Sequence, residues 1–183
     1  AGLGRSFQDA RLWPSLTVEH AITVAFERHH AARAAVGAML ALPVAVDAEA
    51  AVRDEALALI DRFGLGAFRN KFVAELSTGT RRIVEIATLT AHRPRVLLLD
   101  EPSSGIAQKE AEALVPLLRD LRATLGCTLV VIDHDIALIT ELADRLVALD
   151  QGRIIATGPP GTVIDDPEVA ASFLGARPSD RRS

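Results

Sequence analysis

The chain has 183 residues, 49% of them apolar and 24% charged, with a formal net charge of −4. This balance is ordinary for a soluble globular domain, and the lack of a dense basic stripe argues against a nucleic-acid-binding protein. The longest apolar run, Ala34 to Val46, falls short of the roughly 20 residues that a membrane-spanning helix needs, so the chain itself is not expected to cross a membrane.

The first half of the chain is predicted to be helical after an opening loop. Glycines punctuate residues 1–12, and this composition is typical of a loop. Helices are expected over about 17–29, 31–42 and 47–63. Thr17 is interpreted as the cap of the first, the second ends near Pro43, and the apolar residues of the third recur at helical spacing. Asp47 is interpreted as the N-cap of the third helix.

From residue 81 the pattern alternates between helix and strand. Helices over 81–92, 109–125 and 136–142 enclose two apolar runs, 96–99 and 129–132, which are typical of strands covered on both faces. This alternation indicates an α/β fold with a parallel sheet beside the helical part. Near the end of the chain, two short strands are expected at 146–149 and 153–156. One or two short helices are expected at 160–175, followed by a disordered tail at 176–183.

Polar residues follow both apolar strands. Asp100 and Glu101 come directly after the first, at the carboxyl edge where ligands of open α/β sheets bind. Alone, the pair could equally be two solvated charges at a strand end. The second strand is followed by His134, which would stand at the same edge, although a single histidine after a strand is more often a surface residue.

A third motif precedes the helix at 81–92, and a fourth lies near the start of the chain. Ser77 and Gly79 could simply cap that helix and ease the turn into it. Alternatively, they and the helix N-terminus could present hydrogen-bond donors to an anion such as phosphate. Gln8 has an equally plain interpretation as an ordinary loop residue.

In this order, the motifs resemble those of the ABC (ATP-binding cassette) ATPase family. Phe7-Gln8 resembles the Q-loop, and Leu76 to Thr80 resembles the signature motif. Leu98 to Glu101 resembles Walker B with its following glutamate. Ser104 to Ala107 resembles the D-loop, and His134 resembles the switch histidine. The resemblance implies an α/β fold with an incomplete P-loop NTPase (RecA-like) parallel sheet core and an α-helical signature subdomain. Arg11 to Val18 and Gly161 to Gly175 are most similar to the ATPases of branched-chain amino acid importers, although lipopolysaccharide exporters end somewhat similarly.

The resemblance also implies cofactors and roles. ATP and Mg²⁺ would be bound, with Mg²⁺ held by Asp100 and Gln8, partly through water. Glu101 would deprotonate the attacking water, and His134 would donate a hydrogen bond to the γ-phosphate. Ser77 and Gly79 would contact the γ-phosphate of the nucleotide held by the opposite subunit. The nucleotide-binding set is therefore Gln8, Ser77, Gly79, Asp100 and His134, and the catalytic pair is Glu101 and His134.

Four segments and two kinds of partner follow from the same resemblance. The segments are a Q-loop segment at 1–16, a helical subdomain ending in the signature helix at 17–94, the C-terminal part of the ATPase core at 95–158, and a helical extension and tail at 159–183. The partners would be a second ATPase subunit, arranged head to tail, and membrane permease subunits. Nucleic acid is not expected as a partner. The expected location is the cytoplasmic face of the plasma membrane.

The chain departs from the family pattern at three places. No Walker A sequence occurs, which predicts a truncated domain that binds ATP weakly, hydrolyses little alone and exposes apolar sheet surface. Thr80 replaces the signature glutamine, and Ala107 replaces a polar D-loop residue. Two other functions stay open, a soluble ABC ATPase acting on ribosomes or DNA and a non-catalytic regulatory or interaction fragment.

Overall fold

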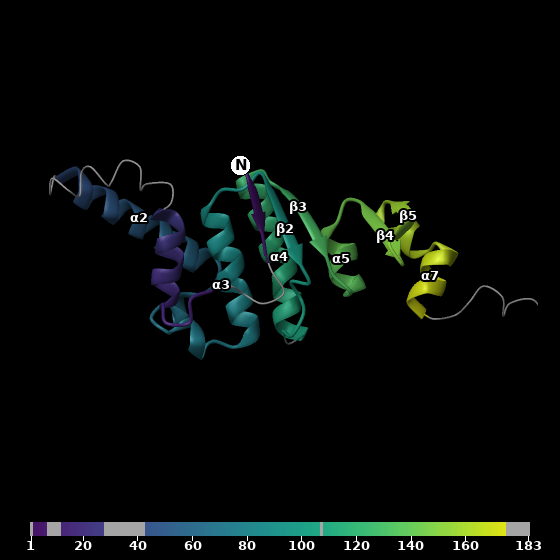
Figure 1. The fold of residues 1–183 in the computed structure, drawn as a ribbon, viewed down its shortest axis with the longest axis horizontal. Coiled ribbons are helices and arrows are strands. Elements are labelled where there is room, and N and C mark those ends of the chain that lie inside the picture. Colours follow the sequence, from purple (N-terminus) through teal and green to yellow (C-terminus); the bar gives the residue numbers. More distant parts are fainter. Residues whose placement is uncertain (1, 7–11, 28–42, 107, 175–183) are drawn as a thin grey trace, which may run out of the picture. The chain divides into compact units, whose positions relative to one another are not determined.

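The protein divides into two compact units, Ala1–Asp133 and His134–Ser183. A computed structural model describes residues 2–6, 12–27, 43–106 and 108–174 (Figure 1). The first unit holds a helix at 18–27 and, in chain order, β1 (Leu3–Arg5), α2 (Pro43–Arg62), two 3₁₀ turns (Gly66–Phe68 and Val73–Glu75), α3 (Thr78–Ala91), β2 (Val96–Asp100), α4 (Gln108–Leu125) and β3 (Thr128–Ile132).

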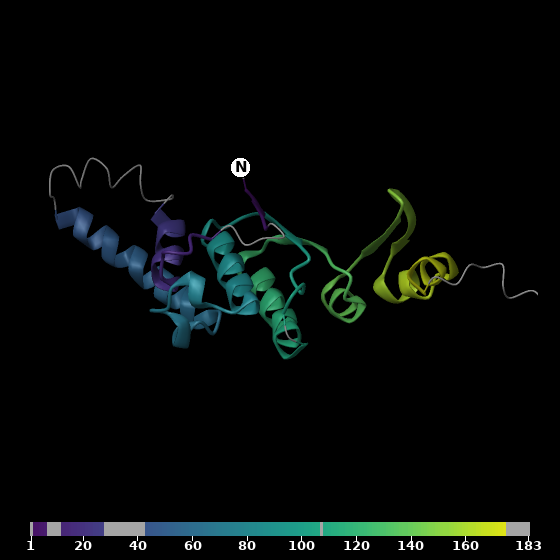
Figure 2. The same ribbon diagram turned by 60° about the horizontal axis from the view of Figure 1, so that its bottom comes forward.

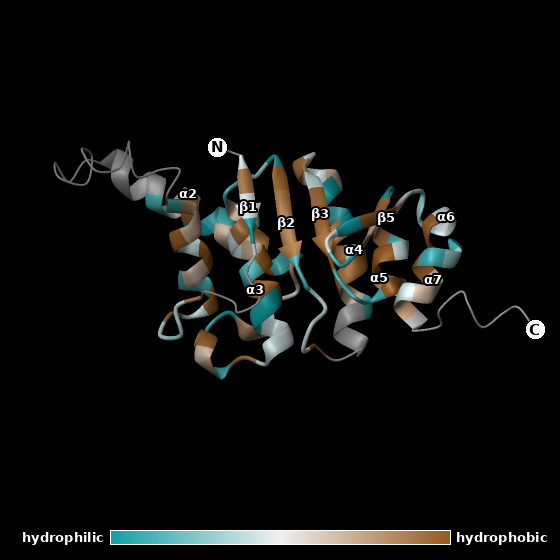
Figure 3. Ribbon diagram, turned by 45° about the vertical axis from the view of Figure 1, so that its right-hand side comes forward, coloured by the Kyte–Doolittle hydropathy of each residue, from teal (hydrophilic) through white to brown (hydrophobic). Residues whose placement is uncertain are grey.

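The three strands of the first unit form a parallel sheet in the order β1-β2-β3. The helices α3 and α4 lie on one face of this sheet (Figure 1 and Figure 2). Alternate residues of β2 point to opposite faces, so Leu97 and Leu99, at most 1% exposed, are buried while their neighbours are half-buried. The apolar character of β2 and β3 is visible in Figure 3. The α/β prediction with a parallel sheet is confirmed for this unit.

Two expectations about the strands are wrong. The opening residues are not all loop, because Leu3–Arg5 forms β1. Gly4 permits this pairing, since a Cβ there would come within 3.1 Å of Leu97 Cδ1. The strand at 129–132 is not buried on both faces: β3 lies at the edge of the three-stranded sheet, and Ile132 is 63% exposed.

Two helices of the first unit, α2 and α3, begin earlier than the sequence pattern predicted. α2 starts at Pro43, so Asp47 lies inside the helix and is not its N-cap. α3 starts at Thr78, one turn before Arg81. The predicted helix at 31–42 lies outside the described residues.

Two ion pairs that share Glu19 join distant segments of this helical part. The Glu19 carboxylate, on the helix at 18–27, accepts hydrogen bonds from Arg53 Nε at 2.9 Å and Arg69 Nε at 2.7 Å. Because its side chain is only 12% exposed, Glu19 needs these partners to remain charged. The two ion pairs therefore join this helix to α2 and to the loop after the first 3₁₀ turn.

The second unit contains α5 (Ile136–Leu142), β4 (Leu146–Asp150), β5 (Arg153–Gly158), α6 (Pro160–Ile164) and α7 (Pro167–Leu174). The strands pair antiparallel across Gln151 and Gly152, whose φ values of 46° and 79° suit a tight hairpin turn. A small core of Ala148, Val163 and Val169 joins the hairpin to the helices. The predicted hairpin and short helices are confirmed. No helix in the described part of either unit is long and apolar enough to cross a membrane.

Candidate functional site

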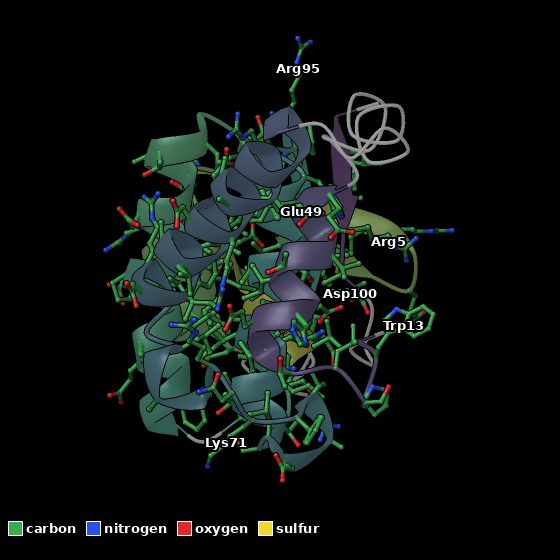
Figure 4. The ribbon with its side chains drawn as sticks, turned by 90° about the vertical axis from the view of Figure 1, so that its left-hand side faces the viewer. Arg5, Trp13, Glu49, Lys71, Arg95 and Asp100 are labelled. Carbon is green, nitrogen blue, oxygen red and sulfur yellow. The ribbon has the colours of Figure 1, made fainter. Side chains whose placement is uncertain are left out.

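The candidate site is built around the carboxyl end of β2. Asp100 is the last residue of this strand, and Glu101 follows it, both half-buried (Figure 4 labels Asp100). Glu101 N donates a hydrogen bond to Ile132 O at 2.7 Å, which prolongs the pairing with β3 by one residue. The two carboxylates predicted from the sequence therefore do stand at the carboxyl edge of a parallel sheet.

Ser6, the residue after β1, fastens the other side of this strand end. Its backbone N donates to Leu98 O at 2.9 Å, and its hydroxyl accepts a hydrogen bond from Asp100 N at 3.0 Å. Only 1% of Ser6 is exposed, so both bonds are shielded from water. β1 and β3 thus hold the backbone of Asp100 and Glu101 from opposite sides.

A buried arginine of α3 completes the support. Arg82 Nη2 donates to Asp100 O at 2.8 Å and to Glu101 O at 2.9 Å. Arg82 Nη1 donates to Glu85 Oε2 at 2.7 Å, and the two side chains are only 6% and 7% exposed. A buried guanidinium needs such partners, because an uncompensated charge in the interior is strongly destabilising.

The N-terminus of α3 carries the predicted Ser77 and Gly79. Ser77 caps the helix, since its hydroxyl accepts a hydrogen bond from Thr80 N at 3.1 Å. The Thr80 hydroxyl lies 2.9 Å from the Ser77 hydroxyl, so threonine stabilises the cap at the position where the signature glutamine was expected. Ser77 is exposed and Gly79 is buried. With no acidic residue in its first turn, this helix end suits an anion.

The loop after Glu101 is held between this helix end and the end of β3. Ser103 donates from its backbone N to Asp133 Oδ2 at 3.0 Å and from its hydroxyl to Asp133 Oδ1 at 2.7 Å. Gly105 has φ +71°, and a Cβ there would lie 3.4 Å from Thr78 Cγ2, so the loop approaches the first turn of α3. The structure therefore brings Asp100, Glu101 and the described part of the predicted D-loop, 104–106, close to the start of α3.

Two predicted site residues are not part of this arrangement. Gln8 lies outside the described residues. His134 begins the second unit. It is followed by Asp135, the N-cap of α5, whose carboxylate accepts a hydrogen bond from Leu138 N at 3.1 Å. That His134 lies beside Asp100 and Glu101 stays a prediction.

The donor chemistry at this edge fits Mg²⁺ bound together with a triphosphate. Among the described residues, no three His, Cys, Asp or Glu side chains are grouped as a metal cage. Mg²⁺ does not require such a cage, because it usually keeps several waters and binds one or two carboxylates together with substrate phosphates. Asp100, half-buried at the strand end, is a suitable single carboxylate.

Sequence reasoning missed the residues that hold the site in place. Ser6 and Arg82 act on backbone atoms of residues far away in the chain, so no local motif identifies them. The one available signal was the opposite charges of Arg82 and Glu85, three positions apart within the helix.

A protein-family model described as ABC transporter matches residues 1–104. The chain is 32% identical over 174 residues to BraF, a high-affinity branched-chain amino acid transport ATP-binding protein of Pseudomonas aeruginosa, covering 95% of the chain and 68% of BraF. It is also 32% identical over 139 residues to the methionine import ATP-binding protein MetN of Haemophilus influenzae, covering 74% of the chain and 40% of MetN.

Solved structures agree with the fold. The structure of CbiO1 from Clostridium perfringens, part of an ABC transporter complex, matches with a TM-score of 0.71 and 26% identity, over 97% of this chain and 64% of CbiO1. A dimeric structure of the ATP-binding cassette MJ0796, bound to ADP and Pi in a post-hydrolysis state, matches with a TM-score of 0.67 and 26% identity, over 86% of this chain and 62% of that one. The chain thus spans slightly less than two thirds of these two structures.

Proposed function

Because the chain belongs to the ABC transporter family, we propose that it is the core of an ATP-hydrolysing subunit that drives import of branched-chain amino acids or similar small solutes. The observation that carries this proposal is the pair Asp100 and Glu101 at the carboxyl end of β2, with their backbone fastened by Ser6, Ile132 and Arg82. Such preorganisation suits phosphoryl transfer, in which positioning and charge stabilisation do most of the catalysis.

The proposed roles follow the chemistry of each side chain. ATP, when bound, would supply the γ-phosphoryl group, and Mg²⁺ would neutralise part of its charge. Asp100 and Gln8 would hold the metal, partly through water. Glu101 orients the attacking water and accepts its proton. His134 would donate a hydrogen bond to the γ-phosphate.

Two copies of the subunit are proposed to share each nucleotide, head to tail. Ser77, exposed at the start of α3, and Gly79, buried in its first turn, would contact the γ-phosphate of ATP held by the partner subunit. A dimeric arrangement is supported by the similarity to MJ0796, whose dimer was solved with ADP and Pi. Membrane permease subunits are the second proposed partner, which places the protein at the cytoplasmic face of the membrane. No nucleic acid is proposed to take part.

A division of labour along the chain is part of the proposal. The segment 1–16 would carry the Q-loop, and 17–94 would form the helical subdomain that ends in the signature helix. The segment 95–158 would supply Walker B, the D-loop and the switch histidine, and 159–183 would form a C-terminal extension.

The cargo is the finer part of the proposal. Similarity to BraF extends over more of both chains than similarity to MetN, which favours branched-chain amino acids over methionine. The test is uptake into proteoliposomes by the complete transporter that contains this chain, with ATP inside and leucine or methionine outside. We expect ATP-dependent leucine uptake, lost in Glu101→Gln. Methionine uptake alone would contradict the cargo, and ATP turnover unaffected by permease subunits would contradict a role in transport.

A further inference from the structure

Arg82 joins α3 to the backbone at the catalytic strand end. Its Nη2 donates to the carbonyl oxygens of two consecutive residues, Asp100 at 2.8 Å and Glu101 at 2.9 Å. Its Nη1 donates a hydrogen bond to Glu85 Oε2 at 2.7 Å, which fixes the plane of the guanidinium. Arg82 is 5% exposed, so water competes little for these charge-assisted bonds.

The two carbonyls can reach one nitrogen because Glu101 leaves the strand conformation. Successive carbonyls of an extended strand point to opposite sides, whereas Glu101 has φ +47°, in the left-handed region. A residue with a side chain rarely adopts this conformation, and it persists where surrounding contacts enforce it. Arg82 supplies two of these contacts, on the carbonyls before and after the strained Cα. The direction in which the Glu101 side chain leaves the backbone is therefore tied to Arg82.

Arg82 also lies close to the other candidate nucleotide contact. It belongs to the same helix as Gly79 and to the turn that follows the Ser77 cap, so a rigid movement of the helix N-terminus would also move its guanidinium. On the proposed function, Ser77 meets the nucleotide of the partner subunit, whereas Glu101 serves the nucleotide of its own. Within one subunit, Arg82 thus links the residue proposed for one nucleotide, Ser77, to the residue proposed for the other, Glu101.

We propose that Arg82 is a positioning residue that aligns Glu101 for hydrolysis when the start of α3 engages the nucleotide held by the partner subunit. This inference rests on the proposed function and adds a link between the two nucleotides that each subunit is proposed to contact. Arg82 touches neither the nucleotide nor the water in this scheme. Its effect should therefore fall on turnover and not on ATP affinity.

The test is Arg82→Lys in the complete protein assembled with its transporter. Lysine keeps the charge but lacks the rigid fork that serves Glu85 and both carbonyls together. We expect kcat to fall about tenfold, which corresponds to about 1.4 kcal/mol in the barrier, with KM for ATP changed less than twofold. The control is Val84→Ala in the same helix, a buried residue whose truncation should lower the unfolding temperature and leave kcat unchanged.

A double variant separates positioning from a merely structural role. If Arg82 acts through Glu101, then Arg82→Lys combined with Glu101→Gln should hydrolyse ATP no more slowly than Glu101→Gln alone. An additional tenfold loss in the double variant, or an unchanged kcat in the single one, would overturn the proposal. If Arg82→Lys does not fold, Glu85→Asp serves instead. It keeps the arginine but retracts its carboxylate partner, and we expect a several-fold lower kcat, so an unchanged kcat would be equally decisive.

Failure of the inference can be told apart from failure of the proposed function. If Glu101→Gln abolishes turnover while Arg82→Lys does not change it, the ATPase assignment stands and the positioning role is wrong. If Glu101→Gln turns over ATP at the wild-type rate, the role of Glu101 is wrong and the role of Arg82 fails with it.

Discussion

Substituting Glu19 by Gln tests whether the buried ion pair stabilises the helical part of the first unit. The carboxylate is 12% exposed and accepts hydrogen bonds from Arg69 at 2.7 Å and from Arg53 at 2.9 Å. Removing one partner of a deeply buried pair typically costs about 3–5 kcal/mol. Here the arginines are 35% and 61% exposed, so water can solvate them, and the new amide oxygen can still accept one bond. We therefore expect a loss of about 1–2 kcal/mol in the free energy of unfolding.

The effect should depend on pH in a defined direction. Hydrogen bonding from Arg69, followed by that from Arg53, lowers the pKa of Glu19 below its usual value of 4.5, against the opposing effect of burial. A lowered folded-state pKa contributes stability above the unfolded-state pKa and loses it as the pH falls through the folded-state pKa. The difference between wild type and Glu19→Gln should thus be full at pH 7 and shrink below about pH 4.5.

Urea unfolding of the purified protein at several pH values measures this difference. The matched control is Glu55→Gln in α2, whose ion pair with Arg93 is much more exposed and should be worth less than about 1 kcal/mol. Equal losses for the two variants, or a loss for Glu19→Gln that does not change between pH 7 and acidic pH, would refute the reasoning.

Two further predictions concern α3 and the lone thiol. Ser77→Ala should lower the free energy of unfolding by about 1 kcal/mol through loss of the helix cap, and Ser77→Asp should retain most of the stability, as chemical denaturation would show. Cys127 is 5% exposed, and burial raises the pKa of its thiol, so it should resist a thiol-reactive dye at pH 8 until urea unfolds the protein. Rapid labelling of the native protein would contradict that burial.

The elements that the sequence predicted well have strong local signals. Apolar periodicity and a proline-bounded end indicated α3, and a continuous apolar run followed by two acids indicated β2. The hairpin of β4 and β5 was evident from Gly152 between two apolar runs. In each case the deciding information lies within a few residues of the element itself.

The errors arise where distant residues decide the local structure. β1 has only three residues around a glycine and becomes a strand because it pairs with β2, more than ninety positions away in the register Leu3 with Val96. The exposure of β3 depends on what lies beside it, which an apolar run does not reveal. Likewise, the two acidic residues of the site were found from the sequence, but Ser6 and Arg82, which hold them, were not.

The roles of Asp100 and Glu101 are tested most directly by the Mg²⁺ dependence of ATP hydrolysis in the complete transporter. Asp100→Asn should raise the Mg²⁺ concentration needed for half-maximal turnover, because it weakens the metal ligand. Glu101→Gln should lower kcat by about a hundredfold or more while leaving that concentration unchanged, because it removes the proton acceptor. Wild-type turnover and wild-type Mg²⁺ dependence in both variants would contradict the assignment of this strand end as the hydrolytic site.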